Sequence, residues 1–494
     1  MTTRVAATVY AEDAETGRLH VGRLRFFRTI GESVGVQAPT GAVVLAAGVL
    51  AGVSGGGTAL VQLVAAVAMG FVAFAFVIFT RGFNSAGSVY GFTGAVVGPR
   101  FGFLSAWTLM IVYVGFAGGT YTSVAAEATA VFDGLGVHLS WQVYAIVAFV
   151  LVMGLAFLDI KVSAALILTL EAASMLLVVI VTGIIAAKSG SQGHQPFSPA
   201  PFQPHGAPLS VLGLGVVLVF SSFSGFDAAA TLGEEARQPQ RLIPLAIALS
   251  LAVVACFTIV VTAVVTNAFP SVDQLARDPV ALVTLTDTYV AGWVGELVSI
   301  GATVSAFGAA LACVVAASRI LFALGRDAGP AALRRTSRAG APSAALVFVG
   351  AASLVMLLLF ITEGSVTTAV AVSLTYPADL ILVAYILVVL ASVVFTIRRR
   401  TSWVSPAILV LGLGVLGYIV KITFVPLPPP PYRWDAVAAG VTLVLGVVLP
   451  LIYPPLRRGI RRSPLLRAGA HALLGTRRVS GGDGETRPVG STGR

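Results

Sequence analysis

Long apolar stretches separated by short polar ones follow one another along almost all of the 494 residues. A helix that crosses a bilayer needs about 20 apolar residues, and twelve stretches reach about that length without a long polar interruption. The pattern therefore predicts an all-α integral membrane protein with about twelve transmembrane helices. The predicted spans lie near residues 29–54, 59–80, 102–125, 141–158, 162–187, 209 into 220–235, 242–267, 291–322, 343–361, 366–396, 404–425 and 434–455.

Two of these spans are interrupted by residues that disfavour a continuous helix. In the first, Pro39 removes a backbone donor and Gly41 adds conformational freedom. In the sixth, Gly225 and Asp227 lie in the middle of an apolar segment. The backbone groups that such breaks release must bond to something other than lipid. Each break taken singly is equally consistent with an ordinary kink, which membrane helices tolerate.

The composition agrees with a membrane protein and leaves little room for a soluble domain. Charged residues make up 11% of the chain and the mean hydropathy is +0.94, whereas soluble proteins carry about 25% charged residues. The sequence has no metal-ligand spacing, nucleophile elbow or glycine-rich phosphate loop. We therefore expect neither an enzyme nor a bound cofactor or metal. Cys256 and Cys313 both lie in apolar stretches and are read as small core residues.

The net charge of +10 does not indicate nucleic acid, because the basic residues follow the predicted topology. All but four of the 31 lysines and arginines fall in the tails and in every second loop, and the exceptions are Lys188, Arg277, Lys421 and Arg433. This asymmetry is the positive-inside rule. It predicts an even number of crossings with both termini in the cytoplasm, and the Ala, Gly, Val and Arg bias suggests a bacterial cytoplasmic membrane.

The chain divides into four predicted regions. Residues 1–28 form a cytoplasmic tail, residues 29–400 a core of ten helices, and residues 401–456 two additional transmembrane helices. Residues 457–494 are polar and basic, and we expect a disordered tail that lies on anionic lipid headgroups. A partner protein is an alternative ligand for this tail.

The two interrupted spans lie five spans apart and enter the membrane from opposite sides in this topology. Residues 29–187 and 209–400 are therefore predicted to be inverted repeats. Interrupted segments at matching positions of two halves indicate a substrate site near the middle of the membrane. There, free backbone N–H groups and the ends of half-helices bind the charged groups of a substrate. This pairing favours a transporter over a pair of unrelated kinks.

Several motifs resemble the amino acid-polyamine-organocation (APC) superfamily of permeases between residue 28 and about residue 455. The resemblance implies a LeuT-like fold of ten core helices plus two, with broken helices 1 and 6. It also implies secondary transport of a small molecule, an amino acid or related amine, by alternating access. The matching segments are Phe223-Ser-Gly-Phe-Asp227 followed by Glu234-Glu235, Pro239 and Ile243-Pro244; Arg81 with Ser85–Tyr90; Gly98-Pro99 with Gly102-Phe103; and Ser318-Arg319 with Ala323, Arg326 and Asp327.

The resemblance also assigns candidate substrate-binding residues. It places the substrate carboxylate at the first break, which comprises Gln37, Ala38, Pro39, Thr40 and Gly41. It places the amino group at the sixth-span break, which comprises Phe223, Ser224, Gly225, Phe226 and Asp227. Both phenylalanines are candidates for closing over the ligand or for plain packing, and Asp227 either orients the broken helix or senses a cation. Many relatives have a Gly-x-Gly run at the first break, which this chain lacks.

Two intramembrane acids are candidates for proton coupling. Glu171 lies about nine residues into its span, about 14 Å deep at 1.5 Å per residue. Burial there costs about 3 kcal/mol on the insertion scale, and desolvation disfavours the charged form, so the carboxyl can exchange protons. The alternative is a protonated Glu bonded to a neighbouring helix. Asp379, in the tenth span, is a second candidate.

The basic and acidic residues at the cytoplasmic ends of the spans form a possible gate, for which Arg81 and Arg326 are the main candidates. Topological anchoring by arginine is the plainer interpretation. Together these features predict a permease that takes up an amino acid, with protons as the coupling ion and the lipid bilayer as its environment. The alternatives are an amino acid exchanger, a transporter of polyamines or other organic cations, and a membrane-embedded sensor or enzyme.

Overall fold

All secondary-structure elements in the described part of the chain are helices. The computed structural model describes residues 24, 26–134, 136–157, 160–278, 280–337, 341–399, 403–427 and 430–474. Among these residues there is no strand, and the one β-bridge joins Leu24 to Ala236. The predicted all-α fold class is therefore confirmed. Residues 1–23 and 25, most of the predicted amino-terminal tail, lie outside the described residues.

The long helices fall near the predicted spans, and several shorter ones lie between them or after the last span. The first half contains α2 (Phe26–Gln37), α3 (Pro39–Ser54), α4 (Thr58–Gly82), α5 (Val89–Val96), α6 (Pro99–Gly134), α7 (Trp141–Ala156) and α8 (Ile160–Ser191). The second half contains η1 (Ala200–Phe202), α9 (Leu209–Phe220), η2 (Ser221–Phe223), η3 (Phe226–Leu232), α10 (Pro239–Ala268), α11 (Val272–Arg277), α12 (Ala281–Tyr289), α13 (Gly292–Ala328), η4 (Ala331–Arg334), α14 (Ser343–Phe360) and α15 (Val366–Arg399). The chain continues with α16 (Val404–Phe424), α17 (Tyr432–Ile452), α18 (Pro454–Arg462) and α19 (Pro464–Leu474).

Nine helices of the described residues are long and apolar enough to cross a membrane, or ten if the bent pair at the start of the chain is one span. The shorter apolar helices α7 and α9 coincide with the predicted fourth and sixth spans. These lengths and compositions identify a multi-pass membrane protein. The total of twelve crossings stays a prediction.

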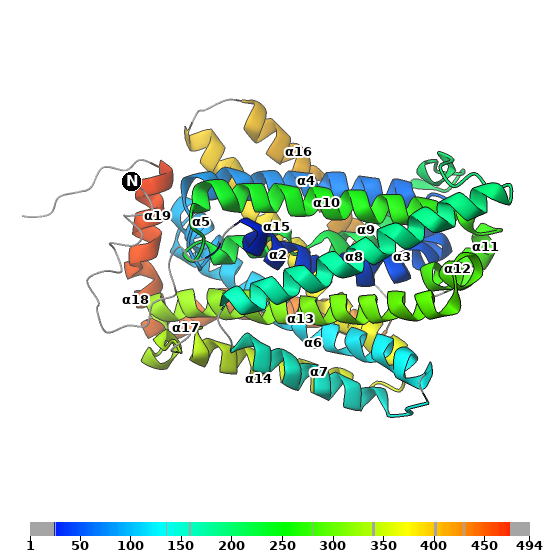
Figure 1. The fold of residues 1–494 in the computed structure, drawn as a ribbon. Coiled ribbons are helices and arrows are strands. Elements are labelled where there is room, and N and C mark those ends of the chain that lie inside the picture. The colour runs from blue at the N-terminus through cyan, green and yellow to red at the C-terminus, as the bar shows by residue number, and fades with distance from the viewer. Residues whose placement is uncertain are drawn as a thin grey trace, which may run out of the picture.

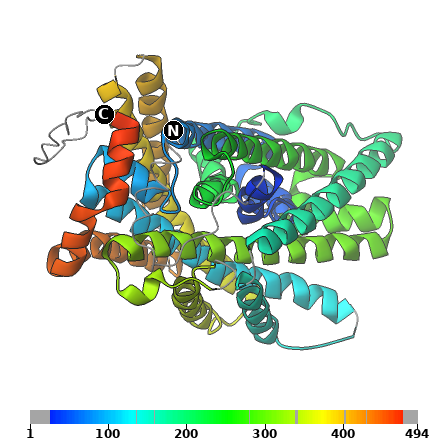
Figure 2. The ribbon, with the colours of Figure 1, turned by 60° about the vertical axis from the view of Figure 1, so that its left-hand side comes forward.

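The long helices lie alongside one another in one bundle, with α13 through its centre (Figure 1). In the most apolar 18-residue window of each helix, 94% of α13 is buried within the protein, against 22% of α16 and 28% of α17. The last two helices therefore present most of their apolar surface outward, as lipid-facing helices do. The first interrupted helix, α2, lies inside the bundle between α8, α10 and α13 (Figure 2).

The carboxyl-terminal region differs from its prediction. Residues 457–462 and 464–474, expected to be disordered, belong to α18 and α19, which lie across one end of the bundle (Figure 1). Apolar residues on one face of these helices are buried: Leu466 packs on Gly94 and Leu473 on Gly82, while Arg399 donates a 2.6 Å hydrogen bond to the Leu473 carbonyl. The many basic residues of this segment made it look polar throughout, so the sequence analysis did not predict its apolar face. Residues 475–494 of the predicted tail lie outside the described residues.

Candidate functional site

The first break lies at Ala38, whose backbone is left-handed with φ 42°. Pro39 begins α3, where its missing N–H is not needed, and its ring keeps the preceding residue out of the right-handed helical conformation. Side chains from other helices therefore satisfy the first free N–H groups of α3. The Thr40 amide donates to Glu171 Oε1 at 3.3 Å and the Gly41 amide to Ser305 Oγ at 3.3 Å.

The second break lies at Gly225, where α9 has given way to the 3₁₀ turns η2 and η3. Gly225 has φ 104°, and a Cβ atom there would lie 2.2 Å from Val36 Cγ1. Only glycine fits both the conformation and the space. Ser33 of α2 donates to the Phe226 carbonyl at 2.6 Å and accepts from the Ala229 amide at 3.0 Å. The two broken helices are thus bonded to each other.

A cavity of about 250 Å³ lies at the two breaks. Of the ten predicted substrate-binding residues, four line it: Gln37, Ala38, Gly41 and Ser224. Its polar wall is completed by Thr120, Ser123, Glu127 and Ser222, and its apolar wall includes Val36, Ala42, Ala46, Val49, Leu50, Phe116, Leu218, Val219, Ala306, Ala309, Val370 and Leu374. The other six predicted residues are Pro39, Thr40, Phe223, Gly225, Phe226 and Asp227, and they are not among the described lining residues.

Asp227 is fully buried behind the break instead of facing the cavity. Its carboxylate accepts one hydrogen bond from Tyr113 at 2.8 Å and another from Tyr385 at 2.7 Å. Tyr385 also accepts a 3.2 Å hydrogen bond from the Gly225 amide. Of the two roles expected for Asp227, this geometry favours orientation of the broken helix. Phe223 and Phe226 are fully buried as well, and the Phe226 ring packs edge-on against Phe76, with centroids 5.9 Å apart.

Two carboxyl groups meet at the start of α3. Glu171 of α8 is 2% exposed, and its Oε1 accepts from Ser305 Oγ at 3.0 Å in addition to the Thr40 amide. Glu127 of α6 lines the cavity, and its Oε1 lies 3.7 Å from where a Cβ of Gly41 would be. The Oε2 atoms of both residues have no hydrogen-bond partner among the described groups. We call Glu127 and Glu171 the acid pair.

Sequence analysis missed Glu127 because it ended the third span near residue 125, whereas α6 continues to Gly134. An acid just beyond the predicted end of an apolar stretch was the signal that could have identified it. Asp379, the second predicted coupling residue, lies elsewhere. It is buried on α15, where the negative charge of Asp435 from α17 repels its carboxylate. It is not among the described residues that line the cavity.

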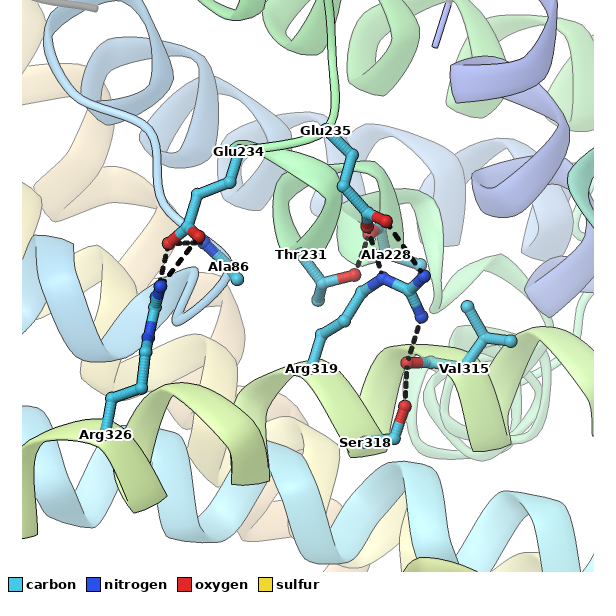
Figure 3. Close-up of polar contacts among 9 residues, drawn as sticks. All are labelled: Ala86, Ala228, Thr231, Glu234, Glu235, Val315, Ser318, Arg319 and Arg326. Carbon is cyan, nitrogen blue, oxygen red and sulfur yellow. Dashed lines mark hydrogen bonds and ion pairs between the residues drawn. The ribbon is translucent and has the colours of Figure 1, made fainter. Parts of the chain in front are cut away.

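Two ion pairs connect α13 to the segment that follows η3 (Figure 3). Arg319 Nε lies 2.6 Å from Glu235 Oε2, and both side chains are buried. Arg326 Nη1 donates to Glu234 Oε2 at 2.9 Å, and the Ala86 amide donates to Glu234 Oε1 at 3.1 Å. Of the predicted gate residues, Arg326 is therefore in an ion pair. Arg81 is exposed, and none of the ion pairs among the described residues includes it.

The Arg326–Glu234 pair predicts a specific pH dependence. Burial by itself raises the pKa of Glu234, but the Arg326 charge and hydrogen bond and the Ala86 amide lower it below its ordinary value of 4.5. Ionised Glu234 therefore adds stability above about pH 4.5, and this stability is lost as the pH falls below that value through the lowered pKa. We expect Glu234→Gln to melt at a lower temperature than the parent protein at about pH 7 and about pH 5.5, with the difference shrinking as the pH falls below about 4.5. A difference that disappears already near pH 6 would contradict the ion pair.

The comparisons with known proteins agree with this geometry. A family model described as amino acid permease matches residues 24–449. The chain is 28% identical over 330 residues to the branched-chain amino acid permease BcaP of Bacillus subtilis, an alignment that covers 63% of this chain and 67% of that protein. It is 28% identical over 336 residues to the vacuolar cationic amino acid transporter 2 of Arabidopsis thaliana, covering 64% and 52%. It is 27% identical over 314 residues to the methylthioribose transporter of Bacillus subtilis, covering 60% and 65%.

Proposed function

Because the chain belongs to the amino acid permease family, we propose that it takes up an amino acid by alternating access together with a proton. The observation that carries this proposal is the hydrogen bond from the Thr40 amide to Glu171. The start of a helix binds anions through its free N–H groups and its dipole. In this protein a side-chain carboxyl already occupies that position.

Competition for the start of α3 couples the substrate to a proton. A substrate carboxylate that approaches the Thr40 and Gly41 amides meets Glu171, with Glu127 beside it. Carboxylates within a few ångströms of one another in a poorly solvated site repel strongly. Protonation of Glu171 removes that repulsion and weakens its hold on the Thr40 amide, which then binds the substrate. Substrate binding therefore takes up a proton at the acid pair.

The remaining walls of the cavity suit the other parts of an amino acid. Ser222, Ser224 and the side chain of Glu127 offer acceptors for an ammonium group. The wall formed by aliphatic residues such as Val49, Leu50 and Leu218 offers no charge to a substrate side chain. We propose an amino acid with an aliphatic side chain, which agrees with the name of the branched-chain relative.

An organic cation is the second candidate, and the presence of the Glu127 carboxyl in the cavity lining favours it. If both members of the acid pair are ionised, the cavity holds negative charge beside its polar wall, and an amine without a carboxylate would bind there. Two relatives are named as cationic amino acid transporters. An exchanger would use the same cavity and would differ in whether the empty carrier reorients.

The membrane orientation is part of the proposal. We propose that the end of the bundle with α18, α19 and Arg399 faces the cytoplasm, since basic residues are retained on that side of a bacterial plasma membrane.

Uptake into proteoliposomes tests the substrate and the coupling together. We expect labelled leucine to accumulate under an inward proton gradient and to be displaced by excess unlabelled isoleucine. Lysine and a diamine should not accumulate. Protein-free liposomes are the control. Accumulation of the diamine alone would establish the second candidate, and uptake that ignores the gradient but requires internal leucine would establish exchange. No uptake of any amino acid or amine would refute transport of this substrate class.

A further inference from the structure

Glu32 is a buried carboxyl that the proposed transport cycle does not use. It lies on α2, is 0% exposed, and neither of its oxygens has a hydrogen-bond partner among the described groups. An unpaired polar group in the interior is costly and calls for an explanation. The acid pair lies beyond Gln37, on the other side of the first break. Glu32 therefore forms a separate titratable position on the half-helix that precedes the break.

The charges that act on Glu32 are those of the Arg319–Glu235 pair. α2 packs against α8, α10, η3 and α13. Among the described residues of these neighbours, the charged groups found to act on Glu32 are Arg319 of α13 and Glu235, which follows η3, and the Cys313 thiol is also nearby. Arg319 gives Nε and Nη2 to Glu235, at 2.6 and 3.4 Å, and donates Nη1 to the Val315 carbonyl at 3.0 Å (Figure 3). The Arg319 guanidinium thus interacts electrostatically with two buried carboxyls, those of Glu32 and Glu235.

Protonation of Glu32 decides the charge balance of this group. With Glu32 protonated, Arg319 and Glu235 neutralise each other. With Glu32 ionised, the group carries a net negative charge without water to solvate it, which a tightly packed interior does not accommodate. An ionised Glu32 would attract the Arg319 guanidinium and so compete with Glu235 for it.

Leu24, which precedes α2, is bonded to the same segment that carries Glu235. The Leu24 amide donates to the Glu235 carbonyl at 2.9 Å, and the Arg237 amide donates to the Leu24 carbonyl at 3.0 Å. At the other end, Ser33 bonds to η3. A change in the partner of Arg319 therefore acts directly on the attachment of α2 to α13 and to the segment after η3.

We propose that Glu32 is a second proton-exchanging carboxyl and that it acts through Arg319 as a positioning residue. Protonated Glu32 leaves Arg319 with Glu235, and α2 stays packed against α13. Ionised Glu32 draws Arg319 away from Glu235 and releases α2. This inference rests on the proposed proton coupling, for which it supplies the step that exposes the cavity on the side of α2.

Thiol labelling without substrate tests the proposal independently of transport. Ala312 of α13 is buried and its Cβ lies 3.6 Å from where a Cβ of Gly35 on α2 would be, so Ala312→Cys reports separation of the two helices. In a Cys256→Ser, Cys313→Ser background, labelling by a water-soluble maleimide should accelerate about tenfold or more between about pH 5.5 and about pH 8, after correction for the intrinsic rate of the thiol. With Glu32→Gln the corrected rate should stay slow at both values, and Glu32→Asp should restore the acceleration.

Two controls make the result decisive. Ala302→Cys, buried on α13 beside Gly41 on the far side of the break, should be labelled at a rate that does not depend on residue 32. Gel filtration identifies a Gln variant that fails to fold, in which case Glu32→Asp and the parent still test the pH profile. Acceleration that persists with Glu32→Gln would overturn the proposal. If leucine uptake fails while the labelling pattern holds, the proposed function is wrong and the role of Glu32 stands.

Discussion

Replacement of Glu171 with Gln is expected to abolish accumulation of substrate driven by a proton gradient and to spare exchange of internal for external substrate. Gln is close to Glu in size, and its amide oxygen can still accept from the Thr40 amide and from Ser305. It cannot gain or lose a proton. The binding step would therefore proceed without proton uptake. The measurement is uptake of labelled leucine with an inward proton gradient, compared with uptake driven by internal leucine alone.

Glu296→Gln is the matched control for this prediction, because it removes an exposed carboxyl from α13 by the same chemical change. It should accumulate leucine like the parent protein. If Glu171→Gln still accumulates leucine against its gradient, Glu171 serves only to cap α3 and the coupling group lies elsewhere. A Glu127→Gln variant that loses accumulation in the same experiment would then assign the coupling to the other member of the acid pair.

Gly225→Ala is expected to eliminate transport and to destabilise the protein. The methyl group would lie 2.2 Å from Val36 Cγ1 and 3.3 Å from the Val36 carbonyl carbon, in a backbone conformation with φ 104°. A left-handed conformation costs a non-glycine residue about 1–2 kcal/mol, and overpacking adds about 1–3 kcal/mol. Relief of the clash would separate the two breaks that Ser33 joins. The measurements are the unfolding temperature in detergent and leucine uptake.

Gly183→Ala provides the comparison, since a Cβ at that position on α8 meets no other atom within 4 Å. It should match the parent protein in both measurements. Val36→Ala combined with Gly225→Ala removes the 2.2 Å contact with Cγ1 but leaves the Cβ of residue 36 at 2.7 Å and the backbone strain, so it should recover only part of the lost stability. A Gly225→Ala protein that is as stable and active as the parent would show that the second break does not have this geometry.

The sequence alone was sufficient for features that depend on local chemistry. Apolar length predicts spans because each helix satisfies its own backbone and needs only enough apolar surface to cross the bilayer. Pro39 predicts the first break because its ring restricts the residue before it, and Gly225 predicts the second because its φ is accessible at little cost only to glycine. The pairing of the two breaks also followed from their spacing along the chain.

Other features depend on which helices become neighbours, and only the tertiary structure decided them. Asp227 was expected near the substrate, but Tyr113 and Tyr385 turn its carboxylate away from the cavity. Glu127 and Glu171 lie close together because α6 and α8, which are far apart in the sequence, both bring a carboxyl to the start of α3. The segment 457–474 packs on the bundle because Leu466 lies against Gly94 of α5 and Leu473 against Gly82 of α4.

The chain by itself therefore determined that this protein spans a membrane many times and breaks two of its helices, since those properties reside in single segments. It did not determine what the freed backbone groups bind or which buried acids face one another. Those outcomes depend on the directions in which side chains from distant segments point once the helices have packed, and no local pattern carries that information.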